Sequence, residues 1–146
     1  LMITEKKAVV SIGELPVVKG YKRQLQQVFQ NLISNALKYH KPGIPPVVTI
    51  HSRQVSGDES MLAIATEDKN KPFYLIEVRD NGIGFEQQYA ERIFHMFTRL
   101  HGNREYSGTG IGLAIARRVA ENHKGYIFAQ GEPGKGATFR LLLPAE

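Results

Sequence analysis

The segment from Tyr21 to Tyr39 constrains the fold more than any other part of the sequence. Its apolar residues recur at steps of three and four positions, the spacing of an amphipathic helix with one buried stripe. These residues are Leu25, Val28, Phe29, Leu32 and Ala36. Prolines and a glycine between residues 42 and 46 end the pattern. A helix of this kind has to cover another layer of structure.

The rest of the chain alternates strand-like segments with two further helical ones. Strands are predicted for residues 8–12, 15–18, 47–55 and 73–80, and two more flank the turn at 133–136. Helices are predicted for residues 86–97 and 109–123, the second with Gly125 as its C-cap, and residues 98–108 have the length of a functional loop such as a lid. The segments 47–55 and 73–80 should pair as antiparallel strands. This order predicts an α+β fold, a two-layer sandwich of a mixed, mainly antiparallel sheet with about three helices on one face.

The composition fits one domain spanning residues 1–146. With 146 residues, of which 42% are hydrophobic, the chain can bury a single core but is too short for two. It lacks a run of about 18 apolar residues and a secretory signal pattern, so we expect a cytoplasmic domain without direct membrane contact. The absence of cysteine excludes disulfides and thiolate ligands. The formal charge is +5, but lysine and arginine are scattered among acids, which argues against nucleic acid as a partner.

The run DNGIGF follows a strand-like segment, and its first residue has the parity of Ile76 and Val78. Because side chains alternate between the faces of a strand, Asp80 should lie on the buried face. A buried carboxylate needs a donor, since an unpaired one is costly or loses its charge. Gly82 and Gly84 would let something approach the backbone closely. The run therefore indicates the floor of a pocket, with a plain Asp-Asn-Gly turn as the alternative.

A second set of polar residues lies on the first helix. Gln27, Asn31, Asn35 and then Lys38 or Tyr39 are about one turn apart and share a face opposite the apolar stripe. A solvent-exposed face would explain them. Asparagine, however, is a poor mid-helix residue, by about 0.5 kcal/mol relative to alanine. Amide oxygens suit Mg²⁺, and a lysine suits phosphate.

A third feature is the run GTGIGL, whose glycines at 108, 110 and 112 directly precede the last helix. Free N–H groups at a helix start favour an anion, with phosphate the expected one. A flexible hinge is the alternative. The P-loop, dinucleotide and protein-kinase motifs are absent, and neither a Ser-His-Asp set nor a metal-binding histidine spacing stands out.

These runs occur in the order found in a known family. QNLISNALKYH resembles the N box, DNGIGF the first glycine box, FHMFTRLH the F box, GTGIGLAIA the second glycine box and PGKGATF the third element of the catalytic, ATP-binding domain of sensor histidine kinases. The set covers about residues 7–144 and is most similar to kinases with PAS or phytochrome-like sensors. The resemblance implies the Bergerat ATP-binding fold of the GHKL superfamily, with ATP and Mg²⁺ as cofactors.

Matching positions imply the site residues. Asn35 would ligate Mg²⁺, and Asn31 and Lys38 would lie at the phosphates. Asp80 would accept the adenine amine, and Arg99 would meet the terminal phosphate. The implied catalytic residues are Asn31, Lys38 and Arg99. The implied nucleotide contacts are Asn31, Asn35, Lys38, Tyr39, Asp80, Gly82, Ile83, Gly84, Phe97, Arg99, Leu100, Gly108, Thr109, Gly110, Ile111, Gly112, Leu113 and Thr138.

The chemistry of three positions bears on these roles. Asp80 can only accept hydrogen bonds, which favours adenine over guanine. Asn31 stands where the ATPase members carry a glutamate that activates water, and it cannot act as a general base near neutral pH. Transfer is therefore favoured over hydrolysis. Many relatives have Thr or Ser where this chain has Ala137, and strand parity can turn the next hydroxyl, that of Thr138, away from the pocket.

The resemblance implies transfer of the ATP γ-phosphate to a histidine on a separate dimerisation hairpin, with a response regulator as a further partner. None of the five histidines lies in such a hairpin, so the chain would be a fragment of a longer kinase, either soluble or membrane-anchored. The alternatives are an ATP-gated conformational module of the same superfamily and a degenerate binding module without activity. Asn31 in place of glutamate disfavours the first, and the intact Asn35, Asp80 and glycine boxes disfavour the second.

Overall fold

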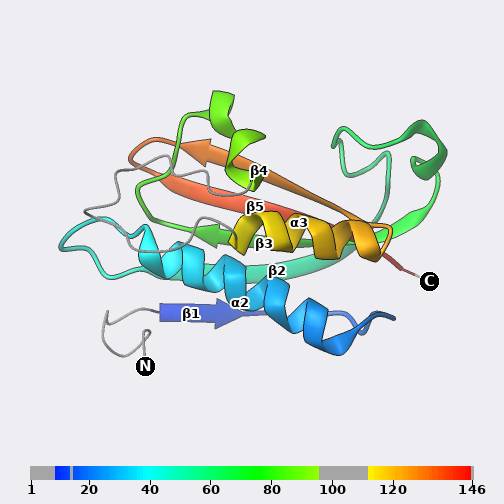
Figure 1. Cartoon of the computed structure of the whole chain (residues 1–146), viewed down its shortest axis with the longest axis horizontal. Helices are drawn as coiled ribbons and strands as arrows, with labels where there is room; N and C mark the ends of the chain where they lie inside the picture. Colours follow the sequence, from blue (N-terminus) through cyan, green and yellow to red (C-terminus); the bar gives the residue numbers. More distant parts are fainter. Residues whose placement is uncertain (1–8, 14, 96–111, 146) are drawn as a thin grey trace.

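The computed structural model describes residues 9–13, 15–95 and 112–145. These residues form a five-stranded sheet with two α-helices across one face (Figure 1), which confirms the α+β fold. The strands are β1 (Val9–Ile12), β2 (Val47–Ser56), β3 (Pro72–Asp80), β4 (Tyr126–Glu132) and β5 (Gly136–Pro144), and the α-helices are α2 (Lys22–Lys38) and α3 (Gly112–Asn122). Three short 3-10 turns are η1 (Thr66–Asp68), η2 (Gln87–Tyr89) and η3 (Arg92–Phe94). No helix in this part of the chain is long and apolar enough to span a bilayer.

The strands lie in the order β1-β2-β3-β5-β4. β1 runs parallel to β2, and the other neighbours are antiparallel, so the predicted pairing of β2 with β3 is confirmed. The register places Val78 of β3 between Ile50 of β2 and Phe139 of β5. All three side chains are buried beneath the helices, so the apolar parity of the strands determines which face carries the core.

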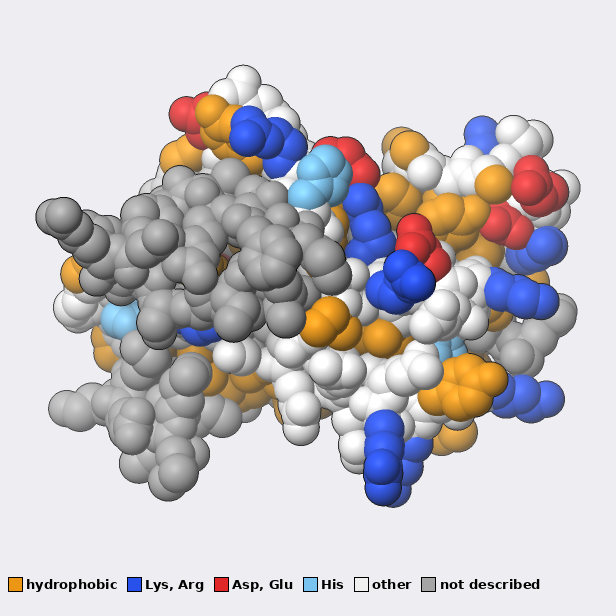
Figure 2. All heavy atoms as spheres, viewed as in Figure 1, with side chains coloured by type: hydrophobic (Ala, Val, Ile, Leu, Met, Phe, Trp, Pro, Cys, Tyr) orange, Lys and Arg blue, Asp and Glu red, His pale blue; other side chains and the backbone are white. Residues whose placement is uncertain are grey.

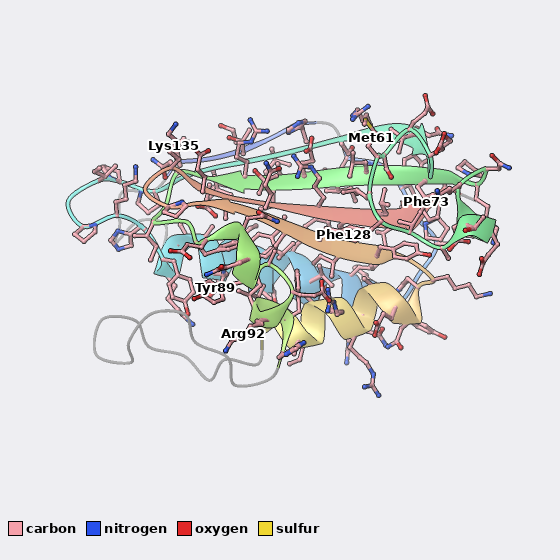
Figure 3. All side chains as sticks on the ribbon, turned by 90° about the horizontal axis from the view of Figure 1, so that it is seen from above. Met61, Phe73, Tyr89, Arg92, Phe128 and Lys135 are labelled. Carbon is pink, nitrogen blue, oxygen red and sulfur yellow. The ribbon has the colours of Figure 1, made fainter. Side chains whose placement is uncertain are left out.

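Two apolar clusters stabilise the sheet, one on each face. The larger lies between the sheet and the helices. The smaller lies on the outer face, where the connection between β2 and β3 (residues 57–71) covers Phe73 and Leu142 with Leu62 and Ile64. Figure 3, at right angles to Figure 1, shows the helices on one side of the sheet and Met61 of this connection on the other. The helix side is therefore the place for a site built from α2, α3 and β3.

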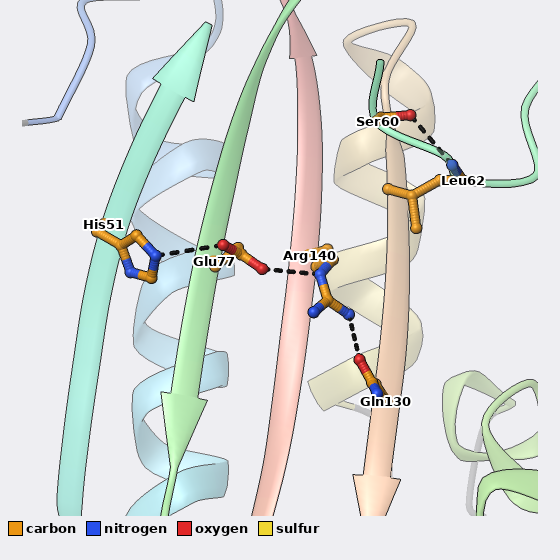
Figure 4. Close-up of polar contacts among 6 residues, drawn as sticks. All are labelled: His51, Ser60, Leu62, Glu77, Gln130 and Arg140. Atoms are coloured by element: carbon orange, nitrogen blue, oxygen red, sulfur yellow. Dashed lines mark hydrogen bonds and ion pairs between the residues drawn. The ribbon is translucent and has the colours of Figure 1, made fainter. Parts of the chain in front are cut away.

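A ladder of polar side chains crosses the rest of the outer face (Figure 4). Glu77 of β3 lies 3.2 Å from Nε2 of His51 on β2 and accepts from Nε of Arg140 on β5 at 2.8 Å. Arg140 also donates to Gln130 of β4 at 2.6 Å. On the opposite face of the sheet, where the helices lie, Figure 2 shows lysine and arginine side chains separated by acidic and uncharged groups. The ladder joins four strands through polar side chains that already have partners.

The predicted helix over residues 86–97 is wrong for its described part, which forms η2 and η3 instead. The side-chain amide of Gln87 donates to the carbonyl of Ala129 at 3.3 Å and accepts from the N–H of Gly131 at 2.9 Å, which ties η2 to the edge of β4. Next to η3, Glu91 accepts two bonds from the guanidinium of Arg117, at 2.7 and 2.9 Å. These contacts with distant residues override a weak local helix preference.

Two smaller predictions also differ from the structure. Residues 15–18 are not a strand. The side chain of Val17 there is 95% exposed, while Val18 packs on the main core, so only part of this apolar segment is buried. At the end of α3 the left-handed residue is Lys124, with φ of +58°, rather than Gly125. Gly125 follows it and donates to the carbonyl of Ala120 at 2.8 Å, and a Cβ on Gly125 would lie 2.1 Å from the carbonyl oxygen of Leu142.

Candidate functional site

Asp80 ends β3 in the middle of the sheet, opposite Val48 of β2 and Ala137 of β5. Its parity is that of Val78, which belongs to the core beneath the helices, so the predicted face is confirmed. Its Oδ1 accepts from the backbone N–H groups of Gly82 at 2.8 Å and Ala137 at 3.3 Å. Among the residues that the structure describes, Oδ2 has no hydrogen-bond partner, so it can accept from a ligand.

Burial raises the pKa of Asp80 above its ordinary value, because the low-dielectric surroundings disfavour the charged carboxylate. The N–H groups of Gly82 and Ala137 act in the opposite direction, since they stabilise the negative charge. Because burial outweighs these two hydrogen bonds, one further donor would stabilise the charged carboxylate. Such a group is a candidate for ligand recognition.

The glycines after Asp80 make room for the protein's own backbone. A Cβ on Gly82 would lie 2.4 Å from the carbonyl oxygen of Tyr39, and that oxygen also accepts from the N–H of Ile83 at 2.9 Å. Gly84 has φ of +68°, and a Cβ there would lie 2.1 Å from the carbonyl oxygen of Glu132. Close approach was predicted from the sequence, but the approaching groups are the C-terminus of α2 and the turn before β5.

Asn81 is a functional candidate that the sequence did not reveal. Its Oδ1 accepts from the N–H of Val47 at 2.8 Å, and its Nδ2 donates to the carbonyl of Pro45 at 3.4 Å. The sequence signal was ambiguous, because Asn before Gly is common in any turn. The partners show that this residue attaches the turn after β3 to the start of β2.

The predicted polar stripe of α2 contacts the predicted glycine run. Nδ2 of Asn31 donates to the carbonyl of Gly112, the first residue of α3, at 3.1 Å. Asn35 is half-buried one turn later, and its amide bonds to no residue within the described ranges. Lys38 lies in the last turn of α2, next to Tyr39, whose carbonyl meets the Asp80 turn. α2 therefore connects the Asp80 end of the site to the start of α3.

The structure places the remaining predicted residues as follows. Phe97, Arg99, Leu100, Gly108, Thr109, Gly110 and Ile111 lie outside the described residues. Leu113 packs on the main core, so apolar packing explains it. Thr138 pairs with Arg79 and Gln130, which puts it on the opposite face of the sheet from Asp80. Its assignment as a nucleotide contact is therefore not supported by the strand register.

The site offers amide rather than carboxylate ligands to a metal ion. In residues 9–13, 15–95 and 112–145, no three His, Asp or Glu side chains gather as a metal-binding set. A hard cation between α2 and α3 would take an amide oxygen such as that of Asn35, and its other ligands would be water and the oxygens of a bound anion.

Residues 20–146 match the family described as histidine kinase-, DNA gyrase B-, and HSP90-like ATPases. The chain belongs to this family. The ATPase-family chain is 39% identical over 142 residues to the phytochrome-like protein Cph1 of Synechocystis sp., covering 97% of this chain and 17% of that protein. It is 34% identical over 148 positions to the sensor histidine kinase WalK of Bacillus subtilis, covering 97% of this chain and 22% of WalK.

The fold of the ATPase-family chain agrees with a solved structure. A crystal structure of full-length ShkA in complex with AMPPNP superposes with a TM-score of 0.73 at 25% identity, covering 98% of this chain and 27% of that one. The ATPase-family chain spans less than a quarter of the length of Cph1 and WalK. Residues 20–146, which match the family, include the motifs that surround Asp80 and Asn31 in this chain.

Proposed function

We propose that the chain is the catalytic, ATP-binding domain of a two-component sensor histidine kinase, which transfers the γ-phosphate of ATP to a histidine on a separate dimerisation hairpin. The observation that carries this proposal is the carboxylate of Asp80 on the helix side of the sheet, whose Oδ2 accepts no hydrogen bond from the part of the chain that the structure describes. The likeness to WalK and Cph1 over nearly the whole chain supports the kinase over other members of the family.

Asp80 would select the base. An ionised carboxylate accepts hydrogen bonds and donates none, so it suits the exocyclic amine of adenine and opposes the carbonyl of guanine. Gly82, Ile83 and Gly84 would line the same end of the site. The ATPase description of the family and the AMPPNP complex of ShkA support adenine nucleotides as the ligand class.

The phosphates would lie between α2 and the start of α3. Gly112 opens α3, where free N–H groups favour an anion. Asn35 would supply an amide oxygen to Mg²⁺, and Lys38 would add a positive charge. When bound, Mg²⁺ would neutralise part of the phosphate charge. Within the described residues the amide of Asn35 has no partner and no carboxylate cluster lies nearby, which fits such a ligand.

Asn31 would position groups rather than move a proton. Its Nδ2 donates to Gly112, and an amide is not basic enough to take a proton from water near neutral pH. Transfer to an imidazole, which is itself a nucleophile, needs no such base. Lys38 and Arg99 would contribute charge neutralisation at the transferred phosphate, and a response regulator would receive the phosphate from the hairpin.

The decisive experiment mixes the chain with the dimerisation hairpin of its own kinase and ATP labelled at the γ-phosphate. Acid-labile label on the hairpin supports the proposal, and its absence with the Asp80→Asn variant ties transfer to this site. Hydrolysis of ATP without label on the hairpin would contradict a histidine kinase and favour an ATP-gated module.

A further inference from the structure

Asn81 makes hydrogen bonds through both its backbone and its side chain, and both reach the start of β2. Its backbone N–H donates to the carbonyl of Val47 at 3.3 Å, while its Oδ1 accepts from the N–H of the same residue at 2.8 Å. Its Nδ2 reaches the carbonyl of Pro45 at 3.4 Å. These contacts continue the pairing of β2 with β3 one residue beyond Asp80.

Asn81 lies between Asp80 and Gly82, whose N–H is the closer of the two donors to the Asp80 carboxylate. Oδ1 of Asp80 accepts from Gly82, two positions later, so Asn81 is the middle residue of this turn. The second donor, Ala137, follows Gly136, which has φ of +121°, and a Cβ there would lie 3.1 Å from the Cα of Asn81. The backbone of Asn81 is therefore confined by β5 on one side and by Val47 on the other.

We propose that Asn81 is a positioning residue for base recognition, an inference that rests on the proposed function. By holding the turn against Pro45 and Val47, it keeps the Gly82 N–H on Oδ1 of Asp80 and leaves Oδ2 for the amine of the base. Asn81 itself does not touch the base. Asn81 acts by orienting the carboxylate of Asp80. Its loss should therefore reduce the discrimination between adenine and other bases.

The first measurement needs no nucleotide. In Asn81→Ala both side-chain bonds are lost, and we expect the amides of Gly82 and Ala137 to exchange with solvent faster while the amides of β4 remain unchanged. The matched control is Asn122→Ala, which removes an exposed asparagine whose amide donates to Gln24 of α2 at 3.5 Å. Unchanged exchange at Gly82 would overturn the inference. If Asn81→Ala does not fold, Asn81→Asp keeps an acceptor for Val47, loses the donor to Pro45 and carries the same test.

The second measurement compares ATP with inosine triphosphate, whose base has a carbonyl in place of the amine. Binding of ATP to Asn81→Ala should weaken at least about tenfold, while binding of inosine triphosphate changes less. The preference for ATP over inosine triphosphate therefore decreases. An equal loss for both nucleotides indicates a merely structural role and rejects the inference. If the unaltered chain binds neither nucleotide, the proposed function fails, and amide exchange still decides whether Asn81 orients Asp80.

Discussion

The side-chain amide of Asn31 donates to the carbonyl oxygen of Gly112 at 3.1 Å and ties the middle of α2 to the first residue of α3. In Asn31→Asp this bond is replaced by two facing acceptors, which repel each other. We expect the amides of the second turn of α3, which close the first helical hydrogen bonds, to exchange faster and phosphotransfer to fall at least about tenfold. Gln27→Asp, one turn earlier on an exposed position, is the control and should leave both measurements unchanged. Normal exchange at α3 in Asn31→Asp would contradict a structural role for this bond.

Asp80→Asn should abolish nucleotide selectivity with little effect on folding. An amide can still accept from Gly82 and Ala137, but its NH₂ group then faces the amine of adenine. The expected loss of ATP affinity is about 1–3 kcal/mol, measured by calorimetry. The melting temperature should stay the same or rise, because a neutral amide is less costly to bury than a carboxylate. Unchanged ATP affinity would show that this carboxylate does not contact the base.

The pH dependence of stability and of binding should have opposite signs at Asp80. Its pKa is raised in the folded state, so between the ordinary value of 3.8 and the raised value the native chain holds more protons than the unfolded chain. The contribution of Asp80 to stability therefore increases as the pH falls through this window. ATP binding needs the ionised form and should weaken over the same window. Urea denaturation measures the stability, and calorimetry the ATP affinity, of the unaltered chain and of Asp80→Asn at several pH values. If stability depends on pH in the same way in both proteins, the raised pKa is refuted.

Tyr126→Phe should loosen the outer face without affecting the nucleotide site. The hydroxyl of Tyr126 donates to Oδ2 of Asp68 at 2.5 Å and accepts from the N–H of Ala65 at 3.2 Å, which holds the β2–β3 connection on the sheet. The hydrogen bond from the Tyr126 hydroxyl also holds the pKa of Asp68 below its ordinary value. We expect a loss of about 1 kcal/mol in the free energy of unfolding at neutral pH and unchanged ATP affinity. The effect of the substitution should shrink in acid as Asp68 becomes protonated.

The parts of the fold that the sequence predicted are those set by local pattern. The stripe of α2 and the parity of β3 follow from side-chain spacing, so α2 and the face of Asp80 were predicted correctly. The family resemblance predicted that the separate motifs form one site. The bond between Asn31 and Gly112 brings two of them together, the N box and the second glycine box.

The parts that were missed depend on partners far away in the sequence. Residues 87–94 follow a path fixed by β4 and by Arg117, which no local pattern contains. Asn81 acts through Val47, 34 residues earlier, and therefore looked like an ordinary turn residue. The sequence predicts that Gly84 makes room for a close approach, and its positive φ and the carbonyl of Glu132 are sufficient reason for a glycine there.

The contact of Gln87 with β4 also bears on how copies of this domain behave at high concentration. Its amide presents an oxygen and an NH₂ group to the strand edge, as the peptide group of a neighbouring strand would. An incoming strand would have to displace this side chain before it could pair with Ala129 and Gly131. The side chain of Gln87 thus protects this part of the β4 edge against edge-to-edge aggregation.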